Sequence, residues 1–95
     1  DYVIIKRRYS GFYLTDLEVL LRAFNRNTLI IAGAATNVCV YATALDAQQR
    51  DMHAVVVSDC VAGTSVELHK AFLDNIDYVV GDVADVDTLI KTLDK

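Results

Sequence analysis

The chain has 95 residues, and its apolar fraction of 54% suits one folded domain and argues against disorder. Its net charge is −4, and its one basic cluster, Lys6-Arg7-Arg8, is too short for a nucleic-acid-binding tail, so we expect no nucleic-acid partner. No apolar run reaches the roughly 20 residues that span a membrane, and two cysteines make no disulfide framework. We therefore expect a cytoplasmic protein with no membrane partner.

Apolar runs and helical spacings alternate along the chain. The apolar runs predict four strands, at residues 2–5, 28–33, 53–59 and 78–81. The continuous run at 28–33 is typical of a strand buried on both faces. Amphipathic spacings predict four helices, at residues 16–25, 37–51, 66–74 and 83–93. The first helix follows Thr15, which fits a capping box with Glu18 in the first turn, and residues 60–65 are expected to form a loop.

This alternation predicts right-handed crossovers and a three-layer α/β/α fold, with a parallel, doubly wound sheet and helices on both faces. In such sheets, sites form beyond the carboxyl ends of the strands. Lys6 follows the first predicted strand, and the segment GAATNVC follows the second. Lys6 and Cys39 are therefore expected to lie close together although they are distant in sequence.

Cys39 falls in the first turn of a predicted helix, with Thr36 or Asn37 as the N-cap. Free N–H groups and the positive helix end favour a thiolate there, and could hold the oxyanion that forms when a thiolate attacks a carbonyl group. The small residues Gly33 and Ala34 let the backbone approach a substrate. The alternative interpretation is a small apolar residue of the core, because free cysteine is among the most buried residue types.

Two segments resemble the isochorismatase-like cysteine hydrolases, a family that includes nicotinamidases, N-carbamoylsarcosine amidases and ureidoacrylate amidohydrolases. GAATNVCVYATALDAQQRDMHAVVVSDCVAG resembles the family's nucleophile segment, and KRRYSGFYLTDLEVLLR resembles its lysine segment. The resemblance implies the isochorismatase-like hydrolase fold without its N-terminal strands. Residues 1–95 are then the C-terminal, nucleophile-bearing portion of a single domain. The absence of an initiator methionine agrees with a portion of a longer protein.

The resemblance also implies roles for individual residues. Cys39 is the nucleophile that forms a thioester, and Lys6 polarises the site and stabilises the thiolate. The backbone N–H groups of Ala35 and Cys39 form the oxyanion hole, and the Ala34–Ala35 peptide bond is cis. The remaining candidates line the substrate pocket or support it: Ser10, Phe12, Thr36 and Asn37.

The family's general base, an aspartate, lies in an upstream segment with no counterpart here, and so do the metal ligands of nicotinamidases. We expect no cofactor in this chain; a metal site, if there is one, belongs to the N-terminal half. His53 and His69 are interpreted as structural or solvated, and Cys60 as a small buried residue. Asp59 is expected to cap or brace the loop after its strand.

Two functions remain open. The first is a hydrolase that cleaves a C–N bond of a small amide or ureido substrate. The alternative is an inactive fragment or a binding or assembly module that lacks the base. A redox role is disfavoured, because the two cysteines follow different strands without Cys-x-x-Cys spacing. We expect a homo-oligomer, or pairing with a polypeptide that supplies the N-terminal half.

Overall fold

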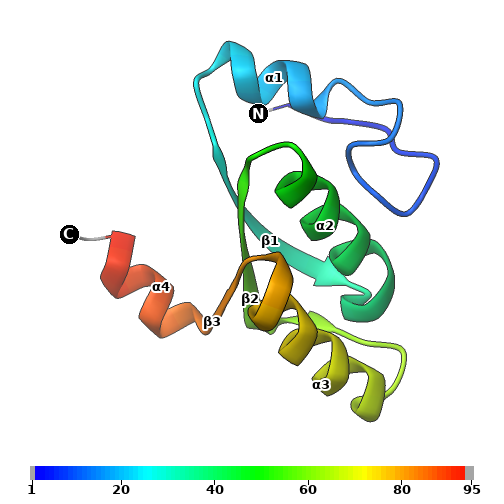
Figure 1. The fold of residues 1–95 in the computed structure, drawn as a ribbon, viewed down its shortest axis with the longest axis vertical. Coiled ribbons are helices and arrows are strands. Elements are labelled where there is room, and N and C mark those ends of the chain that lie inside the picture. Colours follow the sequence, from blue (N-terminus) through cyan, green and yellow to red (C-terminus); the bar gives the residue numbers. More distant parts are fainter. Residues whose placement is uncertain (1, 94–95) are drawn as a thin grey trace.

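The centre of the fold is a three-stranded parallel sheet, seen in a computed structural model that describes residues 2–93. The strands β1 (Thr28–Ala34), β2 (His53–Ala62) and β3 (Asp82–Ala84) lie side by side in chain order (Figure 1). Parallel neighbours need crossover connections, and helices supply both of them. The parallel α/β architecture predicted from the sequence is therefore confirmed.

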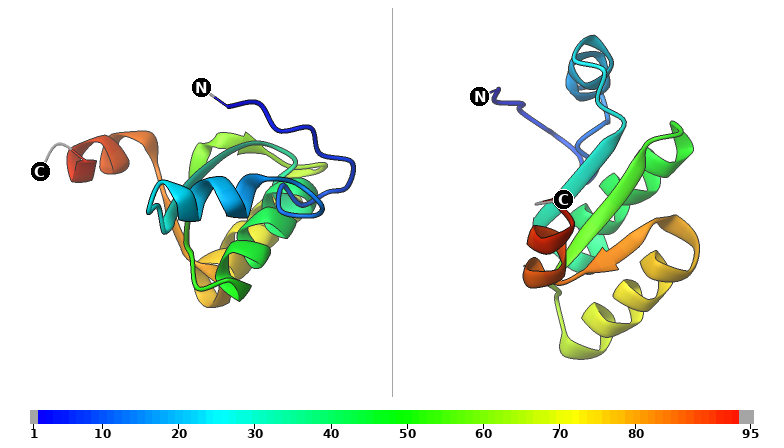
Figure 2. Two further views of the ribbon diagram at one scale, coloured as in Figure 1. Left: turned by 90° about the horizontal axis from the view of Figure 1, so that it is seen from above. Right: turned by 90° about the vertical axis from the view of Figure 1, so that its left-hand side faces the viewer.

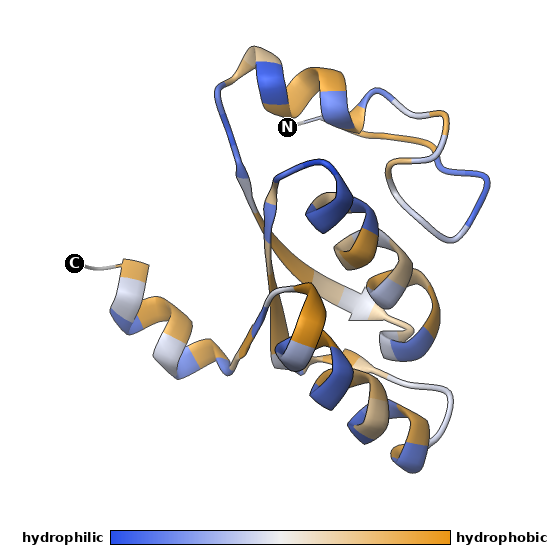
Figure 3. Ribbon diagram, viewed as in Figure 1, coloured by the Kyte–Doolittle hydropathy of each residue, from blue (hydrophilic) through white to orange (hydrophobic). Residues whose placement is uncertain are grey.

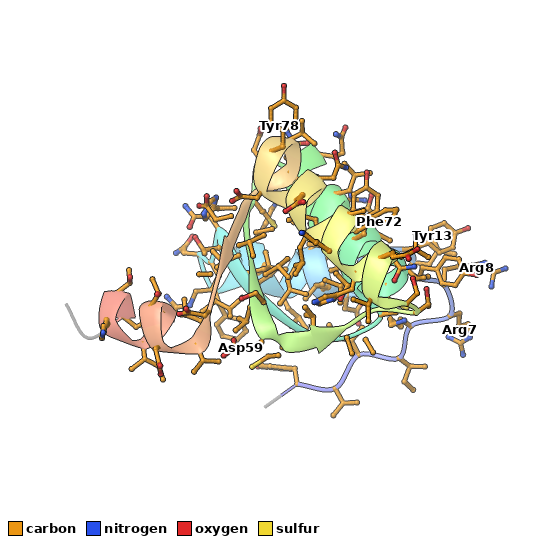
Figure 4. All side chains as sticks on the ribbon, turned by 90° about the horizontal axis from the view of Figure 1, so that it is seen from below. Arg7, Arg8, Tyr13, Asp59, Phe72 and Tyr78 are labelled. Carbon is orange, nitrogen blue, oxygen red and sulfur yellow. The ribbon has the colours of Figure 1, made fainter. Side chains whose placement is uncertain are left out.

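Helices lie on both sides of this sheet. The crossover helices α2 (Tyr41–Gln49) and α3 (Val66–Asn75) cover one face (Figure 2). On the other face, α4 (Val86–Leu93) packs against part of β2, and Figures 2 and 4 show the N-terminal segment passing along that side. None of the helices within residues 2–93 is long and apolar enough to span a membrane.

The core lies between α2 and the sheet. Ala54 and Val56 point from β2 into it and are fully buried, as the alternation of a strand requires. Ala44 and Ala47 of α2 are also fully buried. Their small side chains let the helix approach the sheet closely. In Figure 3 the strands are apolar along most of their length, while α2 and α3 alternate between apolar and polar residues.

The helix α1 (Leu17–Ala23) is tied to α2 by charge rather than by deep burial. Arg50 donates to Glu18 at 2.9 Å, and Arg22 reaches the same carboxylate at 3.3 Å. The hydrogen bond from Arg50 is the main cause of the lowered pKa of Glu18. The predicted capping box is wrong, because Glu18 is used in these pairs, and the Thr15 hydroxyl instead accepts from the Leu17 N–H at 3.3 Å.

Two of the four predicted strands are wrong. Residues 2–5 form no strand, and Val3 is 91% exposed. The run predicted as a strand at 78–81 is helical, because a π-helical turn, η2 (Ile76–Val80), continues α3 and buries Ile76 and Val80 on one side. A short apolar run fits a helical turn as well as a strand, so its period does not decide between them. The last strand is β3, immediately after η2.

Other boundaries shift by a few residues. The strand β2 extends past its predicted end at residue 59, so the predicted loop at 60–65 begins only after Ala62. α1 is shorter than the predicted 16–25, and α4 begins at Val86 rather than at residue 83. The predicted helix 37–51 is divided into a π-helical turn, η1 (Thr36–Val40), and α2. The strand β1 is not buried on both faces, since Ile30 is 49% exposed.

Gly81 allows β2 and η2 to pack at backbone distance. A Cβ at this position would collide with the carbonyl oxygen of Ala54. Only glycine leaves room for the carbonyl there, so this residue fixes how closely the chain returns from η2 to the sheet.

Candidate functional site

Cys39 lies in η1, immediately beyond the carboxyl end of β1. The peptide bond between Ala34 and Ala35 is cis, as the resemblance implies. The carbonyl oxygen of Ala35 accepts from the N–H groups of both Val38 and Val40, each at 3.0 Å. The chain therefore turns directly from strand into helix, and the thiol is placed at the carboxyl edge of the sheet.

The side chains before Cys39 anchor this turn to the start of α3. The Thr36 hydroxyl is fully buried and lies 2.7 Å from Nδ1 of His69. Asn37 donates from Nδ2 to the Thr64 hydroxyl at 2.8 Å and accepts the Thr64 N–H at 3.0 Å. The predicted N-cap is wrong, because the cap position of η1 is Ala35 and no side chain caps it. His69 has the structural role that we predicted for it.

The loop at Gly63 must approach η1 closely for these hydrogen bonds to form. A Cβ on Gly63 would lie 2.7 Å from the Cβ of His69 and 3.2 Å from Oδ1 of Asn37. The first distance is shorter than side chains tolerate. Glycine at this position therefore permits the contact that holds the Cys39 turn.

The structure brings Lys6 and Cys39 together, as the sequence predicts. The Lys6 Nζ lies 3.6 Å from the Cys39 Sγ, although the two residues are 33 positions apart. Nζ also donates to the carbonyl oxygen of Arg8 at 3.3 Å, which steadies the ammonium group beside the sulfur. Cys39 is free and half-buried, so its thiol is neither part of a disulfide nor sealed in the core.

An open cavity of about 490 Å³ lies at this pair, lined by Lys6, Arg7, Arg8, Tyr9 and Cys39. Among residues 2–93, no carboxylate lines it. From the sequence, the basic cluster was considered only as a nucleic-acid-binding tail, for which it is too short. Arg7, Arg8 and Tyr9 were not predicted to lie at the site. The signal that could have placed them is their position directly after Lys6.

The predicted pocket residues do not line this cavity. Ser10 is buried, and its hydroxyl accepts from the N–H of Phe12 at 3.1 Å. The ring of Phe12 belongs to the core, with the guanidinium carbon of Arg50 5.0 Å from its centroid. Thr36 and Asn37 make the anchoring contacts above. A role for these four side chains in binding substrate stays a prediction.

Cys60 is exposed, so the prediction that it is buried is wrong. It lies where the register of β1 and β2 shifts, between the paired positions Val56 and Val61, and no residue of β1 or β3 pairs with it. Asp59, in the same stretch, accepts the N–H of Val86 at 3.0 Å and braces the start of α4. The prediction that Asp59 caps or braces the loop after its strand is therefore wrong, because Asp59 lies within β2 and its partner is the start of a helix.

The remaining candidate histidine, His53, lies far from the thiol at the amino end of β2. Its Nε2 is 2.8 Å from a carboxylate oxygen of Asp82 on the neighbouring strand. Residues 2–93 contain no group of three or more metal-ligating side chains.

The isochorismatase domain family matches residues 1–88, and the chain belongs to this family. The chain is 45% identical over 87 residues to the ureidoacrylate amidohydrolase RutB of Methylobacterium radiotolerans, covering 90% of this chain and 34% of that protein. It is 38% identical over 82 residues to the maleamate amidohydrolase of Pseudomonas putida, covering 85% of this chain and 38% of the relative.

Solved structures agree with this assignment. An isochorismatase-like hydrolase from Alkaliphilus metalliredigens superposes with a TM-score of 0.93 at 34% identity, covering 98% of this chain and 50% of that one. The nicotinamidase PncA of Bacillus subtilis superposes with a TM-score of 0.82 at 36% identity, covering 84% of this chain and 45% of that one. The chain thus spans between about a third and a half of the length of these relatives.

Proposed function

We propose that this chain carries the nucleophile of a cysteine hydrolase that cleaves a C–N bond in a small amide or ureido compound. The observation that carries the proposal is the 3.6 Å distance between the Lys6 Nζ and the Cys39 Sγ in an open cavity. Relatives named as ureidoacrylate and maleamate amidohydrolases support this reaction class.

In the first step, the Cys39 thiolate attacks the carbonyl carbon of the substrate. A C–S bond forms, and the carbonyl oxygen becomes an oxyanion, for which the N–H groups of Ala35 and Cys39 are the proposed donors. Collapse of this intermediate breaks the C–N bond, and the leaving nitrogen takes a proton. Lys6 stabilises the thiolate before attack, because an ammonium group within reach of the sulfur favours its anionic form.

In the second step, water attacks the thioester and releases the acid together with the Cys39 thiol. Both steps need a group that accepts and returns a proton. Among residues 2–93, the cavity at Cys39 has no carboxylate in its lining. The proposal therefore assigns the base to an aspartate outside this chain's described residues, as the family resemblance implies.

The test is hydrolysis of a panel of small amides and ureido acids by the protein at the full length that its gene encodes. We expect turnover that Cys39→Ala abolishes and Cys60→Ala leaves intact. A substrate-derived acyl adduct on the Cys39 peptide, trapped by rapid acid quench and found by mass spectrometry, would establish the thioester. Full turnover in the Cys39→Ala variant would overturn the proposal.

A binding or assembly module is the second candidate function. It is favoured by the lack of a carboxylate in the cavity lining within residues 2–93. It predicts saturable binding of small amides without turnover, and binding that Cys39→Ala leaves unchanged. Turnover lost in Cys39→Ala would eliminate it.

A further inference from the structure

The loop that follows Lys6 lies beside α2 (Figure 2) and is hydrogen-bonded to it. The N–H of Gly11 donates to the hydroxyl oxygen of Thr43 at 2.9 Å, across 32 positions of the chain. Thr43 is in α2, shortly after Cys39, and Gly11 comes shortly after Lys6. Within residues 2–93, this bond and the contact between the Lys6 Nζ and the Cys39 Sγ are the hydrogen bonds that join residues 2–12 to η1 and α2.

The turn around Gly11 has a defined shape, so the bond to Thr43 holds more than one residue. The Ser10 hydroxyl accepts the N–H of Phe12 at 3.1 Å, and the carbonyl oxygen of Ser10 accepts the N–H of Tyr13 at 3.4 Å. Ser10 and Phe12 are both buried. Burial is not directional and sets only how deeply this turn packs. A hydrogen bond is directional, so the Thr43 hydroxyl sets the position of the turn along α2.

We propose that Thr43 is a positioning residue for the reaction at Cys39, because it sets where the Lys6 ammonium group lies relative to the sulfur. This inference rests on the proposed hydrolase function and adds to it a residue that acts through Lys6. The two charged partners are carried by two segments, residues 6–11 and 39–43. These segments are joined at both ends, by the contact between Nζ and Sγ and by the bond between Gly11 and Thr43.

The contact at the sulfur does not hold Lys6 firmly by itself. The Lys6 side chain is exposed, and its ammonium group is 3.6 Å from the Cys39 Sγ. An exposed pair of charged groups contributes little, because fixing a long side chain costs conformational entropy. The bond between Gly11 and Thr43 is partly buried, where water competes less for the donor and the acceptor. The bond to Thr43 is therefore the firmer of the two connections.

A displaced turn weakens the effect of Lys6 on the thiol. The attraction between an ammonium group and a thiolate falls as the distance between them grows. A misplacement of about 1 Å that starts far from the reacting atoms can cost about 10²-fold in rate. Loss of the Thr43 hydroxyl should therefore lower the reactivity of Cys39, although Thr43 does not touch the sulfur through any hydrogen bond in the described part of the chain.

The first experiment removes the Thr43 hydroxyl in the protein at the full length that its gene encodes. Thr43→Val puts a methyl group in place of the hydroxyl and leaves the Gly11 N–H without its acceptor. The rate of alkylation by iodoacetamide is measured separately at Cys39 and Cys60 by peptide mass spectrometry. One hydrogen bond changes an equilibrium by about fivefold, and we expect the Cys39 rate to fall by about that factor while the Cys60 rate stays the same.

The conservative variant Thr43→Ser keeps the hydroxyl and should restore the Cys39 rate to within about twofold of the unchanged protein. Thr43→Ala is a second way to remove the hydroxyl, without a new methyl group beside Gly11. It should slow Cys39 as Thr43→Val does. If neither Thr43→Val nor Thr43→Ala folds, as judged by thermal melting, Thr43 is a residue of the fold and the positioning role is overturned.

A double variant separates positioning from a general loss of structure. Because Thr43 acts through Lys6, Thr43→Val should have no further effect on Cys39 labelling once Lys6→Met has removed the charge. Thr92→Val is the matched control, since it removes from α4 a hydroxyl that donates only within the helix, to the carbonyl oxygen of Thr88 at 2.9 Å. It should leave the Cys39 rate unchanged. Effects of Thr43→Val and Lys6→Met that multiply, or an equal effect of Thr92→Val, would overturn the proposal.

Turnover separates this proposal from the function on which it rests. With an amide that the unchanged protein hydrolyses, Thr43→Val should lower kcat by about fivefold and leave KM within about twofold, because Lys6 acts on the thiolate and not on binding. Slower labelling of Cys39 in Thr43→Val, with no amide hydrolysed by the unchanged protein, would contradict the hydrolase function and leave the positioning role standing. Turnover that Cys39→Ala abolishes and Thr43→Val leaves unchanged would overturn the positioning role and leave the hydrolase standing.

Discussion

The two cysteines differ in their position in the fold, in their exposure and in the groups beside them. Cys39 lies in a π-helical turn at the end of β1, half-buried and beside the ammonium group of Lys6. Cys60 lies in β2 where the register shifts, more exposed than Cys39 and beside no lysine within hydrogen-bonding distance in the described residues. The difference teaches that exposure alone does not make a thiol a candidate nucleophile. A fixed position beside a cation does.

The segments that carry the two thiols are also held differently. The Cys39 turn is fixed from outside by His69 and Thr64, both of which come from beyond β2. The stretch around Cys60 instead holds another element in place, because Asp59 accepts a hydrogen bond from the start of α4. A turn held by three long-range hydrogen bonds keeps one geometry, which a catalytic thiol requires.

The largest expected difference between the two cysteines is in turnover. Replacing Cys39 with alanine should lower kcat/KM for an amide substrate by about 10⁴-fold or more, because the covalent route is lost. The Cys60→Ala variant should stay within about twofold of the unchanged protein. Steady-state kinetics on both variants test this. A large loss of kcat/KM in Cys60→Ala would contradict the proposed difference between the two cysteines.

The next largest effect should come from Lys6. The Lys6→Met variant keeps the length of the side chain and removes its charge, and should slow hydrolysis by about 10²-fold. Alkylation of Cys39 near neutral pH should slow as well, whereas alkylation of Cys60 should not change. If the alkylation rates of both cysteines fall together in this variant, the effect is a general one, and the contact between Lys6 and Cys39 does not explain it.

A stability effect should follow from the anchor of the Cys39 turn. Thr36→Val leaves Nδ1 of His69 without its partner and places a methyl group in a buried polar contact. We expect a loss of about 1–3 kcal/mol in the free energy of unfolding, measured by urea denaturation. Thr28→Val, at an exposed position of β1, is the matched control and should cost under about 0.5 kcal/mol. Equal losses in the two variants would contradict the anchoring role.

The smallest effect should be a pH dependence of the protein's stability, which arises near α4, the helix that Asp59 braces. Asp85 accepts the N–H of Thr88 at 2.7 Å, and this hydrogen bond holds the pKa of Asp85 below its usual value. A lowered pKa in the folded state stabilises the protein above the ordinary aspartate pKa, and this contribution disappears as the pH falls through the folded-state pKa. Asp85→Asn keeps the hydrogen-bond acceptor and removes the charge.

Asp85→Asn should therefore be slightly less stable than the unchanged protein at pH 7, and the difference should vanish in acid. Thermal melts of both proteins across this range measure it. Cys39 alkylation should be the same in both proteins. A difference in stability that grows as the pH falls would have the wrong sign for this account.

The sequence predicts the meeting of Lys6 and Cys39 from the topology of a parallel sheet. Both residues follow apolar runs, and a parallel sheet brings such positions to one edge. The meeting is confirmed, but the reason given for it is wrong, because residues 2–5 form no strand and the N-terminal segment brings Lys6 to Cys39 without being part of the sheet.

Two of the features that the sequence did not predict depend on long-range partners. The hydrogen bond between Thr36 and His69 joins residues 33 positions apart, and no local pattern signals it. The exposure of Cys60 depends on a register shift between two strands, which a single strand's apolar pattern does not reveal. The helical turn at η2 was missed because a short apolar run has no decisive period.

The most direct test of the central claim is the rate at which iodoacetamide labels Cys39 and Cys60 in the native protein near neutral pH. Exposure alone predicts that Cys60 reacts faster, because Cys60 is exposed and Cys39 is half-buried. We predict the reverse order, with Cys39 faster and its advantage lost in Lys6→Met. Equal, slow labelling of both cysteines, or faster labelling of Cys60, would contradict the assignment of Cys39 as an activated nucleophile.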